Sequence, residues 1–296
     1  MSERLGQEIQ HYATFPANPV SLRQMVQFGN SPSAGTMFRA AQFLGEELPI
    51  RLAHRVEELN QLPDGLNEMP SVKKVSNWYA QSFEELTSLP RPELGKDIRE
   101  ILIRGAKESD AKREQLSDLV LNPSLGPKQY TSRPGAGFKT PAANVRRYFS
   151  IVDDVHWPPE IHEYNKKFTK TLSIIKRRHD PVVTTMAQGI IEYKQKQQRQ
   201  HIDDTIQSFL DRFYMSRIGI RMLIGQHITL SAGACRDDYV GIICTKTSVR
   251  DLAQEAIDNA RFICEDYYGL FEAPKVQLVC DPSVEFMYVA GHLSHM

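Results

Sequence analysis

Apolar side chains recur at helical spacing through most of the first 230 residues. Between Val20 and Glu58 the pattern predicts two helices. Gly29-Asn30 separates them, and Ser31 or Ser33 is a suitable N-terminal cap for the second helix. The segment 71–88 predicts a third helix, because its apolar residues fall on adjoining turns.

A proline interrupts this pattern in the second half of the chain. Phe168 to Ile175 mark one helix face, and Pro181 then predicts a break at His179-Asp180, because proline lacks the N–H that a helix uses. The longest apolar stripe follows, from Ile202 to Leu230. Residues 15–230 therefore predict an antiparallel helical bundle.

One long segment does not follow the helical pattern. Residues 121–144 contain four prolines, three glycines, three basic residues and no acid, a composition that favours neither helix nor strand. We interpret them as a mobile surface loop at the centre of an insertion that covers about residues 91–157, in which residues 91–120 are charged and helical.

The pattern changes again after residue 231. The predicted elements are a strand at Tyr239–Thr245, a serine-capped helix at Ser248–Tyr268, strands at Val276–Val279 and Glu285–Val289, and a first helical turn from Gly291. This order is typical of an α+β domain. About 58 residues bury little core, so we expect only part of such a domain.

Composition narrows the function classes. Thirty-six basic and 36 acidic residues give a net charge of zero, which argues against nucleic-acid binding through bulk charge. The four cysteines form no C-x-x-C pair, so no metal site is predicted. No apolar run approaches the ~18 residues of a membrane span, and the first fourteen residues lack the pattern of a signal or transit peptide.

Charged residues that could bind a ligand lie beside an apolar helix surface. Arg217 and Arg221, one turn apart, flank Ile220 and Ile224 and need anionic partners, which either protein carboxylates or a ligand supply. The basic run that ends at His179 is either a solvated helix C-terminus or turns its histidine inward.

Near the N-terminus, bulky apolar side chains occupy two helical faces. They are Pro19, Val20, Met25, Phe28 and Phe43. Core packing accounts for them, and a groove for an apolar arm is the alternative.

Several strings, in order along the chain, resemble one family. They are NPVSLRQMVQFG (18–29), FLGEELPIRLAHR (43–55), WYAQSF (78–83), RRHDPVVTTMAQG (177–189), FYMSRIGIRMLIGQH (213–227) and YVAGHLSHM (288–296). They are similar to the mitochondrial pyruvate dehydrogenase kinases and branched-chain ketoacid dehydrogenase kinases. The resemblance covers nearly the whole chain outside the insertion.

This resemblance implies a mainly α protein in two parts. Residues 1–231 would be a four-helix-bundle-type regulatory domain that docks the lipoyl domain of the dihydrolipoamide acyltransferase core. Residues 238–296 would be the truncated start of an α+β Bergerat (histidine-kinase-like ATPase) domain. The implied function is a homodimeric serine kinase of the mitochondrial matrix that phosphorylates and inactivates the decarboxylase α subunit.

The resemblance also implies particular site residues. The pocket for pyruvate-like carboxylates maps to Leu52, Tyr79, Ser82, Ile175, Lys176, His179, Ser216, Arg217, Ile220, Arg221 and Ile224. By this resemblance, Lys176 stands where the pyruvate dehydrogenase kinases have arginine. The lipoyl-binding positions map to Val20, Met25, Phe28 and Phe43, and Met25 replaces an aromatic residue of the family pattern.

The ATP and magnesium motifs of the family are absent from this sequence. His295 matches the histidine that tunes the general-base glutamate, but that glutamate is missing. We therefore expect no ATP or magnesium to bind this chain, which would be the front portion of an active kinase. A lipoyl-domain-binding fragment without activity is an alternative.

A branched-chain ketoacid dehydrogenase kinase is the other alternative. LAHR (52–55) and VGIICT (240–245) look like that branch, whereas the strings at 177–189 and 213–227 look like the pyruvate branch. We favour pyruvate.

Overall fold

The computed structural model describes residues 2–29, 32–95, 98, 157–197, 204–233, 237–269, 271–281 and 283–294. The predicted loop at 121–144, the predicted helix at 91–120 beyond its first few residues, and His295 lie outside the described residues. The helices are α1 (Glu3–Ala13), α2 (Leu22–Gly29), α3 (Ala34–Asn60), α4 (Pro70–Thr87), α7 (Pro159–Arg178), α8 (Val182–Gln197), α9 (Asp204–Ser231), α10 (Val249–Tyr268) and α11 (Ala290–Ser294), with a 3-10 turn η1 (Leu66–Glu68). The strands are β1 (Tyr239–Val240), β2 (Ile243–Ser248) and β3 (Glu285–Tyr288).

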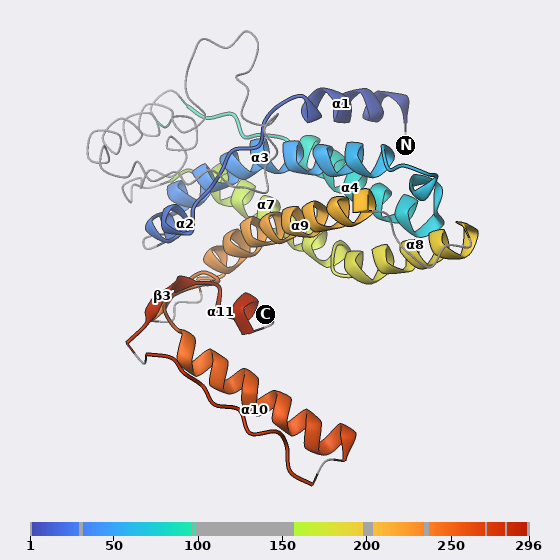
Figure 1. Cartoon of the computed structure of the whole chain (residues 1–296). Helices are drawn as coiled ribbons and strands as arrows, with labels where there is room; N and C mark the ends of the chain where they lie inside the picture. Colours follow the sequence, from blue (N-terminus) through green and yellow to red (C-terminus); the bar gives the residue numbers. More distant parts are fainter. Residues whose placement is uncertain are drawn as a thin grey trace.

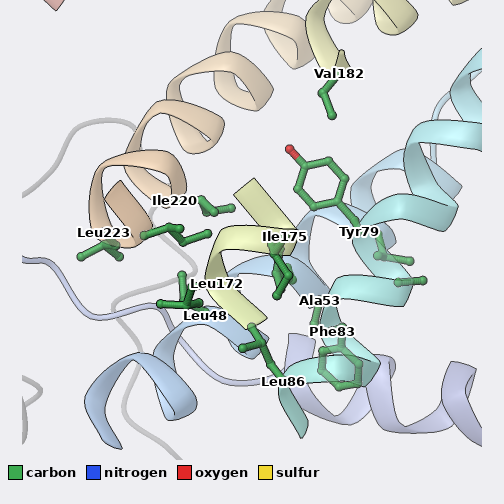
Figure 2. Packing of buried hydrophobic residues seen from close by; sticks show 14 of the residues in the cluster. Leu48, Ala53, Tyr79, Phe83, Leu86, Leu172, Ile175, Val182, Ile220 and Leu223 are labelled. Carbon is green, nitrogen blue, oxygen red and sulfur yellow. The ribbon is translucent and has the colours of Figure 1, made fainter. Parts of the chain in front are cut away.

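The prediction of a mainly helical protein is confirmed. Helix α3 packs against α1, α4, α7 and α9, and α4 packs against α8, so that the long helices lie side by side (Figure 1). The largest fully buried side chains include Tyr79 and Phe83 of α4, Phe168 of α7 and Phe213 of α9. Figure 2 shows how α3, α4, α7 and α9 bring such residues into one core.

The predicted helix boundaries are mostly confirmed by their local chemistry. Ser33 caps α3, because its Oγ accepts a hydrogen bond from the Thr36 N–H at 3.1 Å. Helix α7 ends at Arg178, and His179 is its C-cap, directly before Pro181. The break predicted from Pro181 therefore separates α7 from α8.

Helix α1 has no counterpart among the sequence predictions. Ser2 caps it through a hydrogen bond from the Leu5 N–H, and the helix buries only Leu5 and Ile9 against the bundle. Two apolar positions four residues apart in a polar segment are too few for a periodic signal.

The C-terminal elements form a three-stranded antiparallel sheet in the order β1-β2-β3. The single strand predicted at Tyr239–Thr245 is wrong, because Gly241 adopts a left-handed φ of 63° and turns the chain into a hairpin between β1 and β2. The strand predicted at Val276–Val279 is also wrong, since this exposed segment pairs with no described strand. Helix α10 extends away from the bundle (Figure 1) and has no fully buried residue.

Gln226 of α9 fastens the hairpin to the bundle. Its Nε2 donates to the Val240 carbonyl at 3.0 Å, and its Oε1 accepts from the Ile242 N–H at 2.8 Å. A Cβ added at Gly241, between these two residues, would collide with the Gln226 amide. Gly241 is therefore needed both for its backbone conformation and for its lack of a side chain.

We expect Gly241→Ala to lower the free energy of unfolding by about 2–3 kcal/mol, because it combines left-handed strain with displacement of a buried amide. Gly233→Ala is the matched control, since Gly233 also has a positive φ of 66° but nothing lies within 4 Å of its added Cβ. The control should lose only about 1 kcal/mol. Urea unfolding measures both variants. Equal losses of unfolding free energy would show that the contact with Gln226 adds nothing to the cost of Gly241→Ala.

Both flanks of the chain between residues 95 and 157 contact α3. On one side the exposed Arg91 pairs with Glu46 at 3.7 Å. On the other, the ring of Trp157, 4% exposed, occupies the place that a side chain at Gly35 would take. The bundle thus holds this part of the chain at two points of the same helix.

Candidate functional site

The predicted carboxylate pocket is drawn from four helices that pack together. Leu52 comes from α3, Tyr79 and Ser82 from α4, Ile175, Lys176 and His179 from the end of α7, and Ser216, Arg217, Ile220, Arg221 and Ile224 from α9. The four aliphatic members are at most 1% exposed and belong to the main core. Figure 2 shows Tyr79, Ile175 and Ile220 facing this shared interior. These four aliphatic side chains are thus part of the protein core.

His179 turns inward at the break after α7. Its ring is 1% exposed and lies 4.5 Å from the Tyr79 ring, measured between centroids. Burial, aided by the charges of Arg178, Arg217 and Arg221, lowers the pKa of His179 to about 4. Of the two interpretations of this histidine, the inward one is therefore correct, and the imidazole is neutral at physiological pH.

Ser82 connects His179 to the surface. Its hydroxyl donates to the Trp78 carbonyl at 2.7 Å, so its oxygen accepts from Arg178 Nη1 at 2.8 Å and from His179 Nε2 at 3.0 Å. Because the hydroxyl has one proton, this network assigns the imidazole proton to Nε2. Arg178 also pairs with Glu85, which fixes its guanidinium beside the site.

The two arginines of α9 meet the C-terminal carbonyls of α7. Arg217 Nη2 donates to the carbonyls of His179 and Asp180 at 3.2 and 3.4 Å, and Arg221 Nη1 donates to the Lys176 carbonyl at 3.3 Å. Arg221 also pairs with the Asp180 carboxylate at 2.9 Å. A protein carboxylate therefore neutralises Arg221, whereas Arg217 has no ion pair among the described residues.

Two polar groups of the site have no partner within the described part of the chain. The Tyr79 hydroxyl and Arg217 Nε are buried without a hydrogen bond. Burial raises the pKa of Tyr79 to about 12, against the opposing effect of the nearby Arg217, Arg55 and Arg221 charges. Buried donors without acceptors cost about 1–3 kcal/mol each, so an anion that accepts from both would be stabilised here.

The remaining predicted pocket residues lie at its margin. Lys176 and Ser216 are only partly buried, and among the described contacts neither side chain bonds another predicted member of the pocket. Lys176 contributes its main-chain carbonyl to Arg221 instead. Tyr79, His179 and the two arginines are therefore linked to one another more directly than to the side chains of Lys176 and Ser216.

Of the predicted lipoyl-binding residues, Val20 lies just before α2, Met25 and Phe28 lie on α2, and Phe43 lies on α3. Met25 and Phe43 are 6% and 4% exposed and belong to the main core, and Val20 packs against it. Their burial agrees with the core-packing interpretation. The side chain of Phe28 lies outside the described residues, and the groove stays a prediction.

Within the described ranges, no three His, Cys, Asp or Glu residues gather as metal ligands. No described helix is long and apolar enough to cross a membrane.

Sequence reasoning missed three charged residues of the site. Arg178 holds Ser82, Asp180 pairs with Arg221, and Arg55 lies one turn beyond Leu52 on α3. Arg178 and Asp180 flank His179 at the helix break before Pro181, so this break could have identified both as candidate site residues. Nothing in the local pattern singled out Arg55.

The chain matches a family model described as mitochondrial branched-chain alpha-ketoacid dehydrogenase kinase over residues 19–244. It is 40% identical to the mitochondrial pyruvate dehydrogenase kinase of Schizosaccharomyces pombe, over 100% of this chain and 68% of that protein. Identity is 32% with the enzyme of that name from Arabidopsis thaliana and 29% with human isozyme 3. The chain spans 61% and 58% of these two relatives.

A helical bundle that this model matches over residues 19–244 defines the class as a mitochondrial ketoacid dehydrogenase kinase. The chain belongs to this family, and the similar proteins named above are pyruvate dehydrogenase kinases.

Proposed function

We propose that this chain belongs to a mitochondrial serine kinase that regulates the pyruvate dehydrogenase complex. Relatives from a fungus, a plant and an animal share the name pyruvate dehydrogenase kinase, and each is described as mitochondrial. The family model instead names the branched-chain enzyme. The 40% identity to a pyruvate dehydrogenase kinase over the whole chain favours pyruvate over branched-chain ketoacids.

Within this function, the helical part would be a receptor for a small monocarboxylate such as pyruvate. The observation that carries this proposal is the pair of buried, unpartnered donors at Tyr79 and Arg217. A carboxylate placed between them accepts from the phenol with one oxygen and from the guanidinium with the other. The buried aliphatic side chains of Ile175 and Ile220 suit a methyl group, and exclude water from the charged contact.

His179 would position Tyr79 in this receptor without contributing a charge of its own. The neutral imidazole donates its Nε2 proton to Ser82 and packs its face on Tyr79, so it holds the phenol ring in place. The positive charge in the site comes from the arginine side chains.

Partners and cofactors of the whole protein follow only from the family and are part of this proposal. They are the lipoyl domain of the acyltransferase core, the decarboxylase α subunit as substrate, a second copy in a homodimer, and ATP with magnesium in a part of the protein beyond the described residues. The lipoyl arm would contact the region of Val20, Met25 and Phe43, and titration with a lipoylated domain tests it.

Arg217→Met is expected to weaken pyruvate binding by at least about tenfold, because it removes a cation of the site that has no ion pair among the described residues. The measurement is an NMR titration of the 296-residue chain with pyruvate. Arg177→Met is the control, since Arg177 is an exposed arginine at the C-terminal end of α7, and this change should leave affinity within about twofold.

A folded wild-type chain that shows no pyruvate binding would refute the receptor proposal. Tighter binding of α-ketoisocaproate than of pyruvate would move the assignment to the branched-chain complex. Binding lost equally in both arginine variants would show that net charge, rather than the buried pocket, attracts the anion.

A further inference from the structure

Asp180 lies at the turn between α7 and α8, in contact with both arginines of α9. Its carboxylate Oδ1 is 2.9 Å from Arg221 Nη1, and its main-chain carbonyl accepts a hydrogen bond from Arg217 Nη2 at 3.4 Å. The Asp180 side chain is 57% exposed, against 26% for Arg221. One acidic residue of this chain thus contacts both arginines of the proposed carboxylate site.

These contacts lie beside the groups that would bind the ligand. Arg217 Nη2 also donates to the His179 carbonyl at 3.2 Å, and the His179 ring lies 4.5 Å from the Tyr79 ring, measured between centroids. Arg221 is one turn after Arg217 on α9, and side chains at this spacing are neighbours on a helix surface. An anion held by Arg217 therefore also comes within range of Arg221 and of the Asp180 carboxylate.

The stability of α7 does not account for a carboxylate at this position. Helix α7 ends at Arg178 with His179 as its C-cap, so Asp180 follows the C-terminus directly. The helix macrodipole disfavours a negative charge there and favours the basic residues of the last turn. An ion pair as exposed as the one between Asp180 and Arg221 also contributes little to stability. The main effect of the carboxylate is therefore on the charge of Arg221.

We propose that Asp180 is an internal competitor at the carboxylate site: its carboxylate neutralises Arg221, and a bound monocarboxylate has to share that guanidinium with it. Asp180 thereby lowers the affinity of the site, because it weakens the attraction of Arg221 for the anion and repels the anion directly. The inference rests on the proposed receptor function and deepens it, since it names a residue of this chain that sets the affinity of that site.

A purely structural role predicts the opposite sign. If the ion pair served only to tie the end of α7 to α9, its loss would loosen the arginines and weaken binding. An internal competitor predicts tighter binding when the charge of Asp180 is removed. Asparagine keeps the shape of the side chain and an oxygen that accepts from Arg221, but it carries no charge, whereas glutamate keeps the charge.

The test is pyruvate affinity of the 296-residue chain by NMR titration, with circular dichroism to verify folding. Asp180→Asn should bind pyruvate about three- to fivefold more tightly than wild type, the factor that an exposed ion pair is worth. Asp180→Glu retains the charge and should bind within about twofold of wild type. Asp211→Asn is the matched control, because Asp211 is an exposed carboxylate of α9 that accepts from Gln207 at 3.2 Å, and it should also stay within about twofold.

The outcomes are distinguishable. Unchanged or weaker pyruvate binding by folded Asp180→Asn overturns the inference and leaves the receptor proposal intact, provided that Arg217→Met still loses binding. An equal gain in Asp211→Asn also overturns it, because net charge alone would then be the cause. If Asp180→Asn does not fold, Asp180→Ser decides in its place, since it removes the same charge. No binding by wild type refutes the receptor proposal and this inference with it.

Discussion

Replacing Glu47 by Gln is expected to lower the free energy of unfolding by about 3 kcal/mol. Glu47 is 1% exposed and accepts from the Asn18 N–H at 2.8 Å, from Asn18 Nδ2 at 2.7 Å and from Arg51 Nε at 2.8 Å. Arg51 Nη2 completes the cluster on the Asn18 carbonyl at 2.6 Å. Without the Glu47 charge, the nearly buried Arg51 guanidinium has no counter-charge, and such a loss is among the costliest single changes.

The neighbouring Glu46→Gln is the matched control. Glu46 is exposed and pairs with Arg91 at 3.7 Å, a geometry worth about 1 kcal/mol or less. Urea unfolding followed by circular dichroism measures both variants. Similar midpoints for the two would show that the Asn18-Glu47-Arg51 cluster does not hold the segment before α2 onto α3.

Stability is also expected to fall as the pH is lowered from about 6.5 to about 4. Burial lowers the pKa of both His179 and His227 from 6.5 to about 4 in the folded protein. The unfolded chain therefore binds more protons in this range, and protonation favours unfolding. Each histidine contributes about 3 kcal/mol that is present above pH 6.5 and is lost progressively as the pH approaches 4.

The slope of stability against pH checks this result. The double variant His179→Asn with His227→Asn should have a clearly flatter dependence between pH 6.5 and 4, even if it is less stable throughout. His162→Asn is the control, because His162 is exposed on α7 and its loss should leave the slope unchanged. A double variant as steep as wild type would mean that other groups cause the acid sensitivity.

The long helices were predictable because their signal is local and redundant. Between Val20 and Glu58 many apolar positions share one period, and a serine stands at the start of α3. The break between α7 and α8 follows from the chemistry of one residue, Pro181. These features depend on neighbours in sequence, so the sequence alone carries them.

The C-terminal elements show why other predictions failed. The run at 239–245 is rich in β-branched residues, yet the chain turns at Gly241, where the Gln226 amide binds both sides of the turn. The apolar residues at 276–279 have no partner strand among the described residues, and propensity without pairing makes no sheet.

For the site, the residues alone left two interpretations of Arg217 and Arg221. The structure gives one answer to each: Arg221 has a protein carboxylate in Asp180, and Arg217 has none among the described residues. Such pairing depends on how α7 meets α9, which no local spacing encodes. The same is true of Arg55, whose hydrogen bond to the Arg212 carbonyl arises only from the packing of α3 against α9.

The attachment of Arg91 and Trp157 to α3 has a thermodynamic consequence. Their contacts, Glu46 and Gly35, are eleven residues apart on one helix, or about 16 Å at ~1.5 Å per residue. The two contacts thus place the residues on either side of this connection along the same helix. For any flexible connection between two such points, doubling its length would change the loop-closure free energy by only about 0.6 kcal/mol.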